Sequence, residues 1–227
     1  MLRRYHPILT GAIFGPLTAL SSRKLDTGGL STQVMDRSLD NPPDAMPIVT
    51  GFATASGQVR LIWVRSRSGP RVRRILLPGD PRVDAAMIEA IPSIEEPRDG
   101  EILALVAGIR SLLQGKDVRF DIGLLDLDRC PPFQRRVLLA EYGIPRGYVS
   151  TYGRIARHLE KPSAFRAVGN ALARNPFPLV IPCHRALRSD GRLSGFQGGL
   201  ALKRRLLEME GVRFREDGRA FMDHVWY

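Results

Sequence analysis

The sequence predicts an α+β fold, in which a small antiparallel-sheet and helix domain is followed by a C-terminal winged helix-turn-helix domain. Two observations carry this prediction. Between residues 46 and 80, short apolar runs alternate with turn-forming residues, as in a meander of strands. Between residues 132 and 174, apolar residues recur at helical spacing and tight turns separate the segments. We therefore expect an N-terminal domain over residues 46–128 and a C-terminal domain over residues 129–227.

The first 45 residues differ in composition and patterning from the rest of the chain. They are rich in Gly, Pro, Ser and Thr, show no sustained period, and contain no acidic residue before Asp26. Pro7 and Pro16 interrupt the apolar stretch, which argues against a targeting segment. We expect residues 1–45 to be a disordered leader, or Met46 to be the true start of the protein.

Apolar runs separated by Gly, Ser and Pro predict three antiparallel strands in the N-terminal domain, over residues 48–54, 59–64 and 72–77. The same domain should contain two helices, over residues 83–91 and 99–114, and a further strand over residues 118–127. No catalytic constellation is visible in this half of the chain. We expect it to support the other half.

The C-terminal half begins with an apolar helical stripe formed by Phe133, Val137, Leu138 and Tyr142. A second, shorter helix is predicted over residues 152–159, and a third over residues 162–174, where Asn-Pro ends it. A hairpin-like segment follows over residues 212–227. Three helices with tight turns and a closing hairpin are typical of a winged helix-turn-helix.

The net charge of +11 is unevenly distributed along the chain. Residues 1–128 hold 16 Lys and Arg against 15 Asp and Glu, whereas residues 129–227 hold 18 against 8. The excess in the helix-turn-helix half favours a polyanionic partner such as nucleic acid, the alternative being a solvated basic face without a partner. Two cysteines exclude a disulfide framework, and no apolar run reaches the ~20 residues that span a bilayer.

One of the two cysteines, Cys183, directly precedes His184 at the end of an apolar run. A thiol attacks as its thiolate, and a nearby base raises the thiolate fraction at neutral pH. A cysteine flanked by Val, Ile and Pro is also often a plain buried side chain, so the pair alone leaves both interpretations open. The other cysteine, Cys130, lies beside two prolines with no base nearby, and we expect no role for it.

The segment over residues 175–185 reads Asn-Pro-Phe-Pro-Leu-Val-Ile-Pro-Cys-His-Arg. It resembles the active-site signature of the O6-alkylguanine-DNA alkyltransferases (methylated-DNA–protein-cysteine methyltransferases), in which Pro-Cys-His-Arg carries the alkyl-accepting cysteine. The resemblance covers residues 132–211 almost without gaps and residues 46–131 more loosely. Further blocks match in the family's order, over residues 132–134, 144–156, 166–171, 191–200 and 203–211.

The resemblance implies DNA repair by direct reversal, in which Cys183 takes a methyl or small alkyl group from O6 of guanine, or from O4 of thymine. Such a suicide enzyme acts once and needs no cofactor, because the substrate carries the group and the thioether product is stable. His184 would deprotonate Cys183 through a water molecule, and Glu210 would orient His184. Asn175 would hold the segment that bears the cysteine, and Tyr152 would donate a proton or hydrogen bond to the guanine ring. Without the resemblance, these residues have plain alternatives: a packing histidine, a solvated glutamate, an Asn-Pro turn and an amphipathic tyrosine.

The target atom lies inside the duplex, so the base must be extruded. Arg166 matches the family's finger that takes the vacated place in the stack. Small residues beside it, including Ala167 and Gly169, would let the helix approach the minor groove of double-stranded DNA closely. The alternative is an Ala-rich helix packed inside the domain. Arg174 and other nearby arginines would bind phosphates without reading sequence; the others are Arg154, Arg157, Arg188 and Arg192.

The resemblance also implies a base-binding pocket. Pro178 and Phe196 would form its walls, and the backbone of Gln197 and Gly198 would approach the guanine closely. Ala186, whose carbonyl would face the guanine amino group, stands where the family usually has Val, so a somewhat larger alkyl group should fit. Gln197 replaces a small residue common there, so only its backbone role carries over. The N-terminal half has no Cys or clustered His for the structural zinc of some members, and we expect no metal.

We expect a monomer that acts on DNA in the reducing cytoplasm. Two other functions stay open. The first is an alkyltransferase-like protein that senses damage without transfer, although such relatives replace the reactive cysteine that is present here. The second is a winged-helix regulator, which would show sequence preference and dimerise without consuming a thiol.

Overall fold

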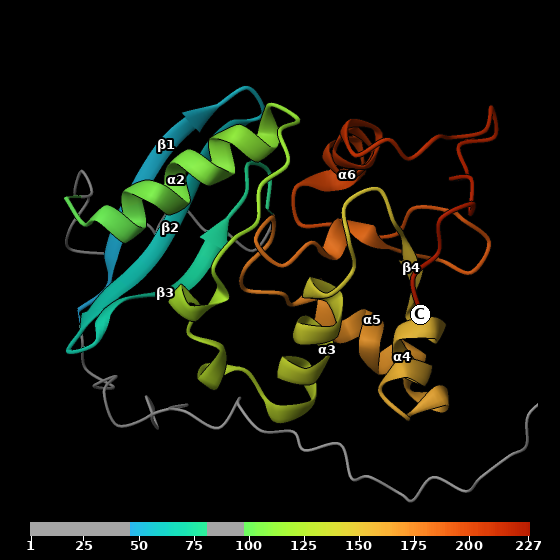
Figure 1. The fold of residues 1–227 in the computed structure, drawn as a ribbon, viewed down its shortest axis with the longest axis horizontal. Coiled ribbons are helices and arrows are strands. Elements are labelled where there is room, and N and C mark those ends of the chain that lie inside the picture. The colour runs from blue at the N-terminus through green and yellow to red at the C-terminus, as the bar shows by residue number, and fades with distance from the viewer. Residues whose placement is uncertain (1–45, 81–97) are drawn as a thin grey trace, which may run out of the picture. The chain divides into compact units, whose positions relative to one another are not determined.

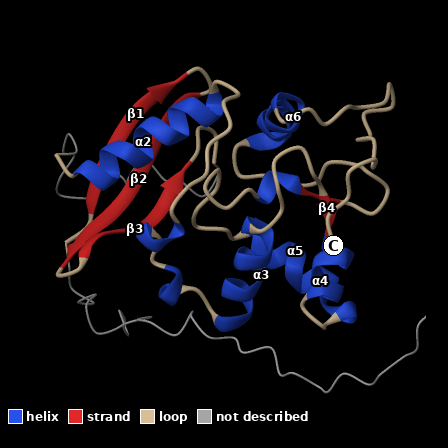
Figure 2. Ribbon diagram, in the orientation of Figure 1, coloured by secondary structure: helices blue, strands red, loops and turns tan. Residues whose placement is uncertain are grey.

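The computed structural model describes residues 46–80 and 98–227. The leader expected over residues 1–45 and the helix expected over residues 83–91 lie outside the described residues. Within them the protein is a mixed α+β structure, with a three-stranded sheet in the N-terminal half and helices in the C-terminal half (Figures 1 and 2). The predicted fold class is confirmed.

The sheet is an antiparallel meander in the order β1-β2-β3, which confirms the three predicted strands. Its members are β1 (Ile48–Thr54), β2 (Gly57–Ser66) and β3 (Gly69–Leu76). Helix α2 (Gly100–Leu113), also predicted, lies across one face of the sheet (Figure 1) and buries an apolar stripe that includes Ile102 and Ile109. Asp99 starts this helix, because its carboxylate accepts hydrogen bonds from the first backbone N–H groups.

The segment that follows α2 is not a strand, so the strand predicted over residues 118–127 is wrong. Two 3-10 turns occur here instead, η2 (Ile122–Leu124) and η3 (Leu127–Arg129). Asp121 explains the difference, because its side chain accepts a hydrogen bond from the backbone of Gly123 at 2.7 Å and bends the chain locally. The apolar residues that suggested a strand lie in or beside these turns, and their side chains are still buried. They are Phe120, Leu125 and Leu127.

The predicted helices of the C-terminal half are confirmed. They are α3 (Pro132–Tyr142), α4 (Tyr152–His158) and α5 (Phe165–Ala173). A 3-10 turn, η4 (Pro162–Ala164), leads into α5, and Pro162 occupies its first turn, where a backbone N–H would have no helical partner. Helix α6 (Gly199–Met209) then closes the domain.

The C-terminal half contains two short strands that were not predicted from the sequence. Strand β4 (Ser150–Thr151) pairs in parallel with β5 (Ala186–Leu187), two residues each. The hairpin expected over residues 212–227 is reduced to one antiparallel bridge between Phe214 and Ala220. The chain then passes beside Val149, whose backbone N–H and carbonyl both form hydrogen bonds with it.

The two halves are joined along strand β3. The backbone N–H of Ile75 donates to the carbonyl of Pro176 at 2.8 Å, which links the sheet to the C-terminal half. Within the N-terminal half, the N–H of Asp126 donates to the carbonyl of Val72 at 2.9 Å. One continuous cluster of buried side chains extends from Trp63 in the sheet to Cys183. The sheet therefore supports the segment that carries the Cys-His pair. Among the helices that the structure describes, none is long and apolar enough to cross a membrane.

Candidate active site

Cys183 opens a short 3-10 turn, η5 (Cys183–Arg185), directly after Pro182. The Cys183 side chain is 6% exposed and that of His184 is fully buried. The residues before η5 form a tight turn. Leu179 has a left-handed φ of 74°, and the backbone N–H of Ile181 donates a hydrogen bond to the carbonyl of Phe177. A bulky residue adopts that conformation only where its surroundings impose it, so the cysteine segment is held rather than free.

The buried side chain of Asn175 forms hydrogen bonds that hold the segment leading to Cys183 in place. Its Nδ2 donates to the carbonyl of Ile181 at 3.1 Å and to Cys183 Sγ at 3.2 Å. Its Oδ1 accepts a hydrogen bond from the backbone N–H of Phe177 at 2.9 Å. The amide therefore positions the sulfur and offers a donor that a thiolate can accept.

The thiol needs help to ionise. Burial raises the pKa of Cys183 to about 11, against the hydrogen bond from Asn175 and the charge of Lys203, which lower it. At neutral pH the sulfur therefore carries a proton at rest. Reaction as a nucleophile requires a base that removes this proton and a cation that stabilises the sulfur anion.

His184 is bound on one side by a carboxylate. Its Nε2 lies 2.9 Å from Glu210 Oε1. Burial lowers the pKa of His184, although Glu210 acts in the opposite direction. The neutral ring then places its proton on Nε2, where the carboxylate accepts it, and leaves Nδ1 as a free base. Among the described residues, Nδ1 has no hydrogen-bond partner.

Glu210 is fixed on its other side by a cation, Arg185. Arg185 donates from Nε and Nη2 to the two carboxylate oxygens, both at 2.8 Å, and from Nη1 to the carbonyl of Ile144 at 2.6 Å. Burial opposes ionisation of Glu210, but His184 and Arg185 outweigh it and lower its pKa to about 2. The carboxylate is therefore charged at neutral pH and holds the imidazole in one orientation.

Two buried titratable residues near the cysteine were missed from the sequence. Lys203 on α6 and Glu141 on α3 are both fully buried. The Nζ of Lys203 donates to the carbonyl of Ala186 at 2.7 Å. Burial raises the pKa of Glu141 to about 8, against the charges of Lys203 and Arg185. Each of the two interrupts an otherwise apolar helical stripe, which was the available signal.

A pocket of about 230 Å³ opens onto Cys183. Five of the predicted site residues line it, namely Cys183, Tyr152, Gly169, Phe196 and Gln197, together with Asp80, Leu172, Ala173 and Gly195. The Tyr152 hydroxyl lies 2.5 Å from Ser194 Oγ, and burial raises the pKa of Tyr152, so the phenol keeps its proton. The pocket thus presents a thiol and a phenolic donor to whatever enters it.

The remaining predicted site residues lie around this pocket without lining it. Pro178 and Ala186 are buried, and Gly198 is half-buried directly before α6. Arg166, Ala167 and Arg174 are exposed on α5 and at its end. The Gln197 side chain turns inward, where its Nε2 donates to the carbonyl of Asn175 at 2.5 Å, which leaves only its backbone for a ligand.

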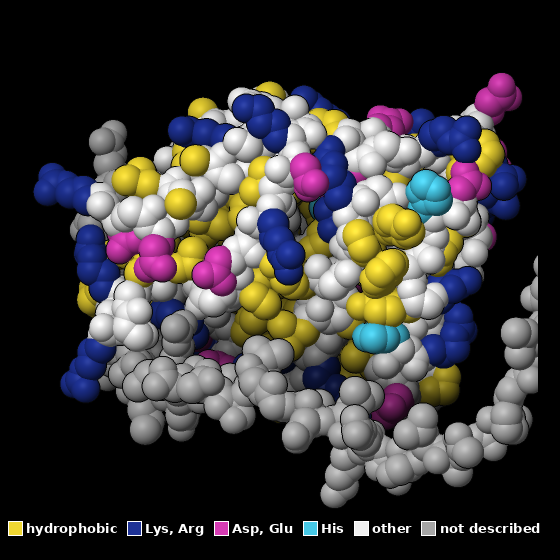
Figure 3. Space-filling view, in the orientation of Figure 1, with side chains coloured by type: hydrophobic (Ala, Val, Ile, Leu, Met, Phe, Trp, Pro, Cys, Tyr) yellow, Lys and Arg dark blue, Asp and Glu magenta, His cyan; other side chains and the backbone are white. Residues whose placement is uncertain are grey.

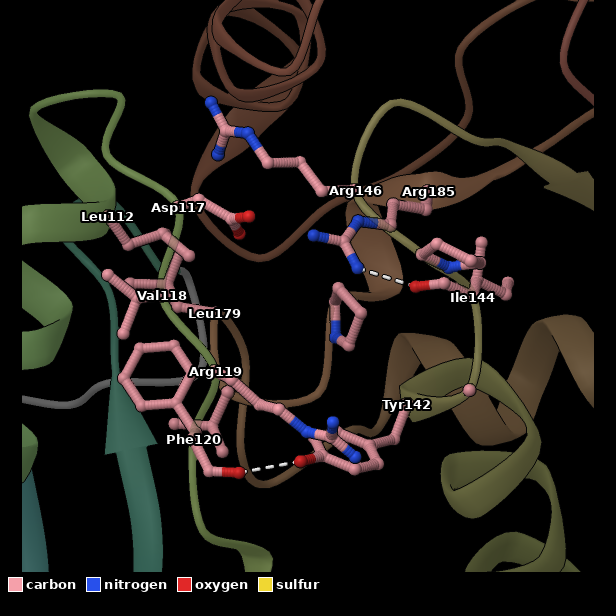
Figure 4. A pocket seen from close by; sticks show the side chains of 14 residues that line it. Leu112, Asp117, Val118, Arg119, Phe120, Tyr142, Ile144, Arg146, Leu179 and Arg185 are labelled. Atoms are coloured by element: carbon pink, nitrogen blue, oxygen red, sulfur yellow. Dashed lines mark hydrogen bonds between the residues drawn. The ribbon is translucent and has the colours of Figure 1, made fainter.

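A second pocket, of about 390 Å³, has Arg185 in its lining (Figure 4). Its walls come from the end of α2, the segment up to Phe120 and the turn before β4. Tyr142 donates to the carbonyl of Phe120 at 2.6 Å across it, and Arg185 reaches Ile144, as Figure 4 shows. Cationic and hydrophobic side chains are interspersed over this face of the molecule (Figure 3). Cys183 does not line this pocket.

Comparisons with known proteins identify relatives of this chain. Residues 132–212 match the family model described as 6-O-methylguanine DNA methyltransferase, DNA binding domain. A methylated-DNA–protein-cysteine methyltransferase of Methanothermobacter thermautotrophicus is 51% identical over 111 residues, which cover 49% of this chain and 62% of that protein. The protein of the same name from Mycobacterium tuberculosis is 40% identical over 121 residues, 53% of this chain and 72% of that one.

Solved structures show the same relationship over more of the chain. The crystal structure of Mycobacterium tuberculosis O6-methylguanine methyltransferase superposes with a TM-score of 0.60 at 30% identity, over 73% of this chain and 93% of that one. A structure of the mycobacterial protein in complex with DNA gives a TM-score of 0.60 at 29% identity, over 72% and 92% of the two chains.

Proposed function

This chain belongs to the methylated-DNA–protein-cysteine methyltransferase family, and we propose that it repairs DNA by moving one methyl or small alkyl group from O6 of guanine to Cys183. The observation that carries the proposal is the continuous buried arrangement around the sulfur. Asn175 bonds the sulfur, His184 follows it with a free Nδ1, and Glu210 fixes the other ring nitrogen. A packing cysteine has no need of an oriented base beside it.

The proposed reaction is a single displacement. The proton of Cys183 passes to Nδ1 of His184, through a water molecule because adjacent side chains do not converge. The thiolate then forms a bond to the alkyl carbon, and the bond from that carbon to O6 breaks. The electron pair goes to the guanine, where Tyr152 donates a hydrogen bond or proton to the ring. The thioether stays on Cys183, so each molecule acts once and no cofactor takes part.

Binding to DNA is proposed to place α5 in the minor groove of a duplex. Arg166 would fill the gap left by the extruded nucleotide, while the small side chain of Ala167 allows close approach. Arg174 and the other exposed arginines supply phosphate contacts without sequence preference. We propose that the protein acts as a monomer on DNA in the cytoplasm, and that the small Ala186 admits alkyl groups larger than methyl.

The test is to incubate the protein with duplex DNA that contains one O6-methylguanine and to weigh the protein and its peptides. We expect one added methyl group on the peptide that contains Cys183, with an equimolar amount of guanine restored in the DNA. Cys183→Ser should bind the duplex without gaining mass, whereas Cys130→Ser should react like the unaltered protein. Tight binding with no gain in mass would favour a damage-sensing protein and refute the transfer.

A further inference from the structure

The first residue of α5, Phe165, is an aromatic side chain that remains 46% exposed. Most exposed apolar side chains stand alone and need no explanation. Phe165 differs because it directly precedes Arg166, and the Arg166 guanidinium lies over its ring at 5.5 Å from the ring centre. A cation held over an aromatic face has a restricted range of positions.

The helix places Phe165 above the pocket that opens onto Cys183. Residues three, four, seven and eight positions apart share one face of a helix. From Phe165 this face continues through Gly169 to Leu172 and Ala173, and these three residues line the pocket. Phe165 therefore lies about one helical turn, or roughly 6 Å, beyond the pocket rim. A nucleotide whose base occupies that pocket has its neighbours in the stack near this end of the helix.

We propose that Phe165 inserts into the DNA base stack together with Arg166, so that the two residues act as one wedge where the damaged nucleotide is extruded. This inference rests on the proposed function, because it concerns the same site. Proteins that bend DNA from the minor groove commonly insert apolar side chains between base steps. The guanidinium of Arg166 would occupy the place in the base stack that the extruded nucleotide leaves. The ring of Phe165 would add stacking against the neighbouring base.

The arrangement also explains why an aromatic side chain stays in solvent in the free protein. Its contact with Arg166 covers part of one face and orders both side chains before DNA arrives. Less ordering entropy is then lost on binding. Phe165 is thus a DNA-contacting residue that acts on extrusion, and it does not touch the reacting atoms.

The experiment compares Phe165→Ala with the unaltered protein on two substrates, a duplex containing O6-methylguanine and the free base O6-methylguanine. Stacking contributes about 1–3 kcal/mol per base, so the transfer rate on the duplex should fall about 5- to 150-fold. The rate with the free base should stay within about twofold, because no extrusion is needed. Phe165→Trp should retain the duplex rate. The matched control is Leu103→Ala on α2, which is 47% exposed and should leave both rates unchanged.

A second measurement separates the wedge from the transfer. In a Cys183→Ser background, 2-aminopurine at the target position of a duplex should brighten as it leaves the stack, and Phe165→Ala should reduce that signal. An unchanged duplex rate together with an unchanged signal would overturn the wedge, and so would an equal loss of rate on both substrates. If the unaltered protein gains no methyl group from either substrate, the proposed function fails, while the 2-aminopurine signal still decides the role of Phe165.

Discussion

Helices α2 and α6 each bury one stripe of side chains at helical spacing, but the two stripes differ in chemistry. The stripe of α2 is entirely apolar and packs on the sheet, with Ile102 and Ile109 fully buried. The stripe of α6 contains Leu206 and Leu207 at the same spacing but begins with a fully buried lysine, Lys203. Burial of apolar surface stabilises a fold, whereas burial of a charge costs stability. The α6 stripe therefore gives up some stability at Lys203, the residue whose charge lowers the pKa of Cys183.

The largest change in stability is expected from α2. Ile109→Ala removes a fully buried side chain and should lower the free energy of unfolding by about 2–5 kcal/mol. Its transfer rate per folded molecule should be unchanged, because α2 contributes nothing to the pocket at Cys183. Urea unfolding and a single-turnover assay on the same preparation measure both quantities. A loss of transfer rate in the folded protein would contradict the inference that α2 contributes to stability and not to reactivity.

The opposite result is expected from α6. Lys203→Met removes the cation whose charge lowers the pKa of Cys183, and also the donor to the carbonyl of Ala186. The transfer rate should fall roughly 10- to 100-fold, which corresponds to about 1–2 units in a thiol pKa. Titration of Cys183 by its rate of alkylation against pH should show the thiol pKa raised. Arg204→Met, an exposed neighbour on the same helix, is the control and should change neither quantity.

An effect that appears only as the pH changes is expected from Glu141 on α3. Its pKa of about 8 in the folded protein lies above the ordinary value of 4.5, so the folded state keeps a proton that the unfolded state loses. The contribution of Glu141 to stability is complete below pH 4.5 and declines as the pH rises to about 8, by up to about 1.4 kcal/mol per unit. Glu141→Gln cannot titrate, so its stability should fall less steeply across this range.

Urea unfolding between pH 5 and pH 9 measures this slope. Glu101→Gln, in the exposed first turn of α2, is the control and should leave the slope unchanged. Equal slopes for Glu141→Gln and the unaltered protein would show that the buried carboxyl does not hold its proton.

Local patterns were sufficient for much of the fold. Alternating apolar runs predicted the three strands, and helical periodicity predicted α2 to α5, because in these segments backbone preference and packing agree. The strand predicted over residues 118–127 failed, since the side chain of Asp121 bonds the backbone two residues on and bends the chain. An apolar run alone does not distinguish a strand from a buried turn.

The predicted site residues came from the order of motifs, not from periodicity. Spacing could not reveal that Arg185 holds both oxygens of Glu210, 25 residues further along the chain. Lys203 and Glu141 were missed for a similar reason, because their surroundings are built from α3, α6 and η5 together. Their placement inside apolar stripes was visible in the sequence, and a charge at such a position is worth treating as a candidate site residue.

The contact between Ile75 and Pro176 bears on aggregation. Strand β3 is an edge of the sheet, and an edge with free backbone groups invites pairing with another chain. Here the carbonyl of Val72 and the N–H of Ile75 are occupied by Asp126 and by Pro176, which begins the cysteine segment. The segment that positions the nucleophile therefore also covers the sheet edge, and a substitution that loosens it would expose a template for self-association.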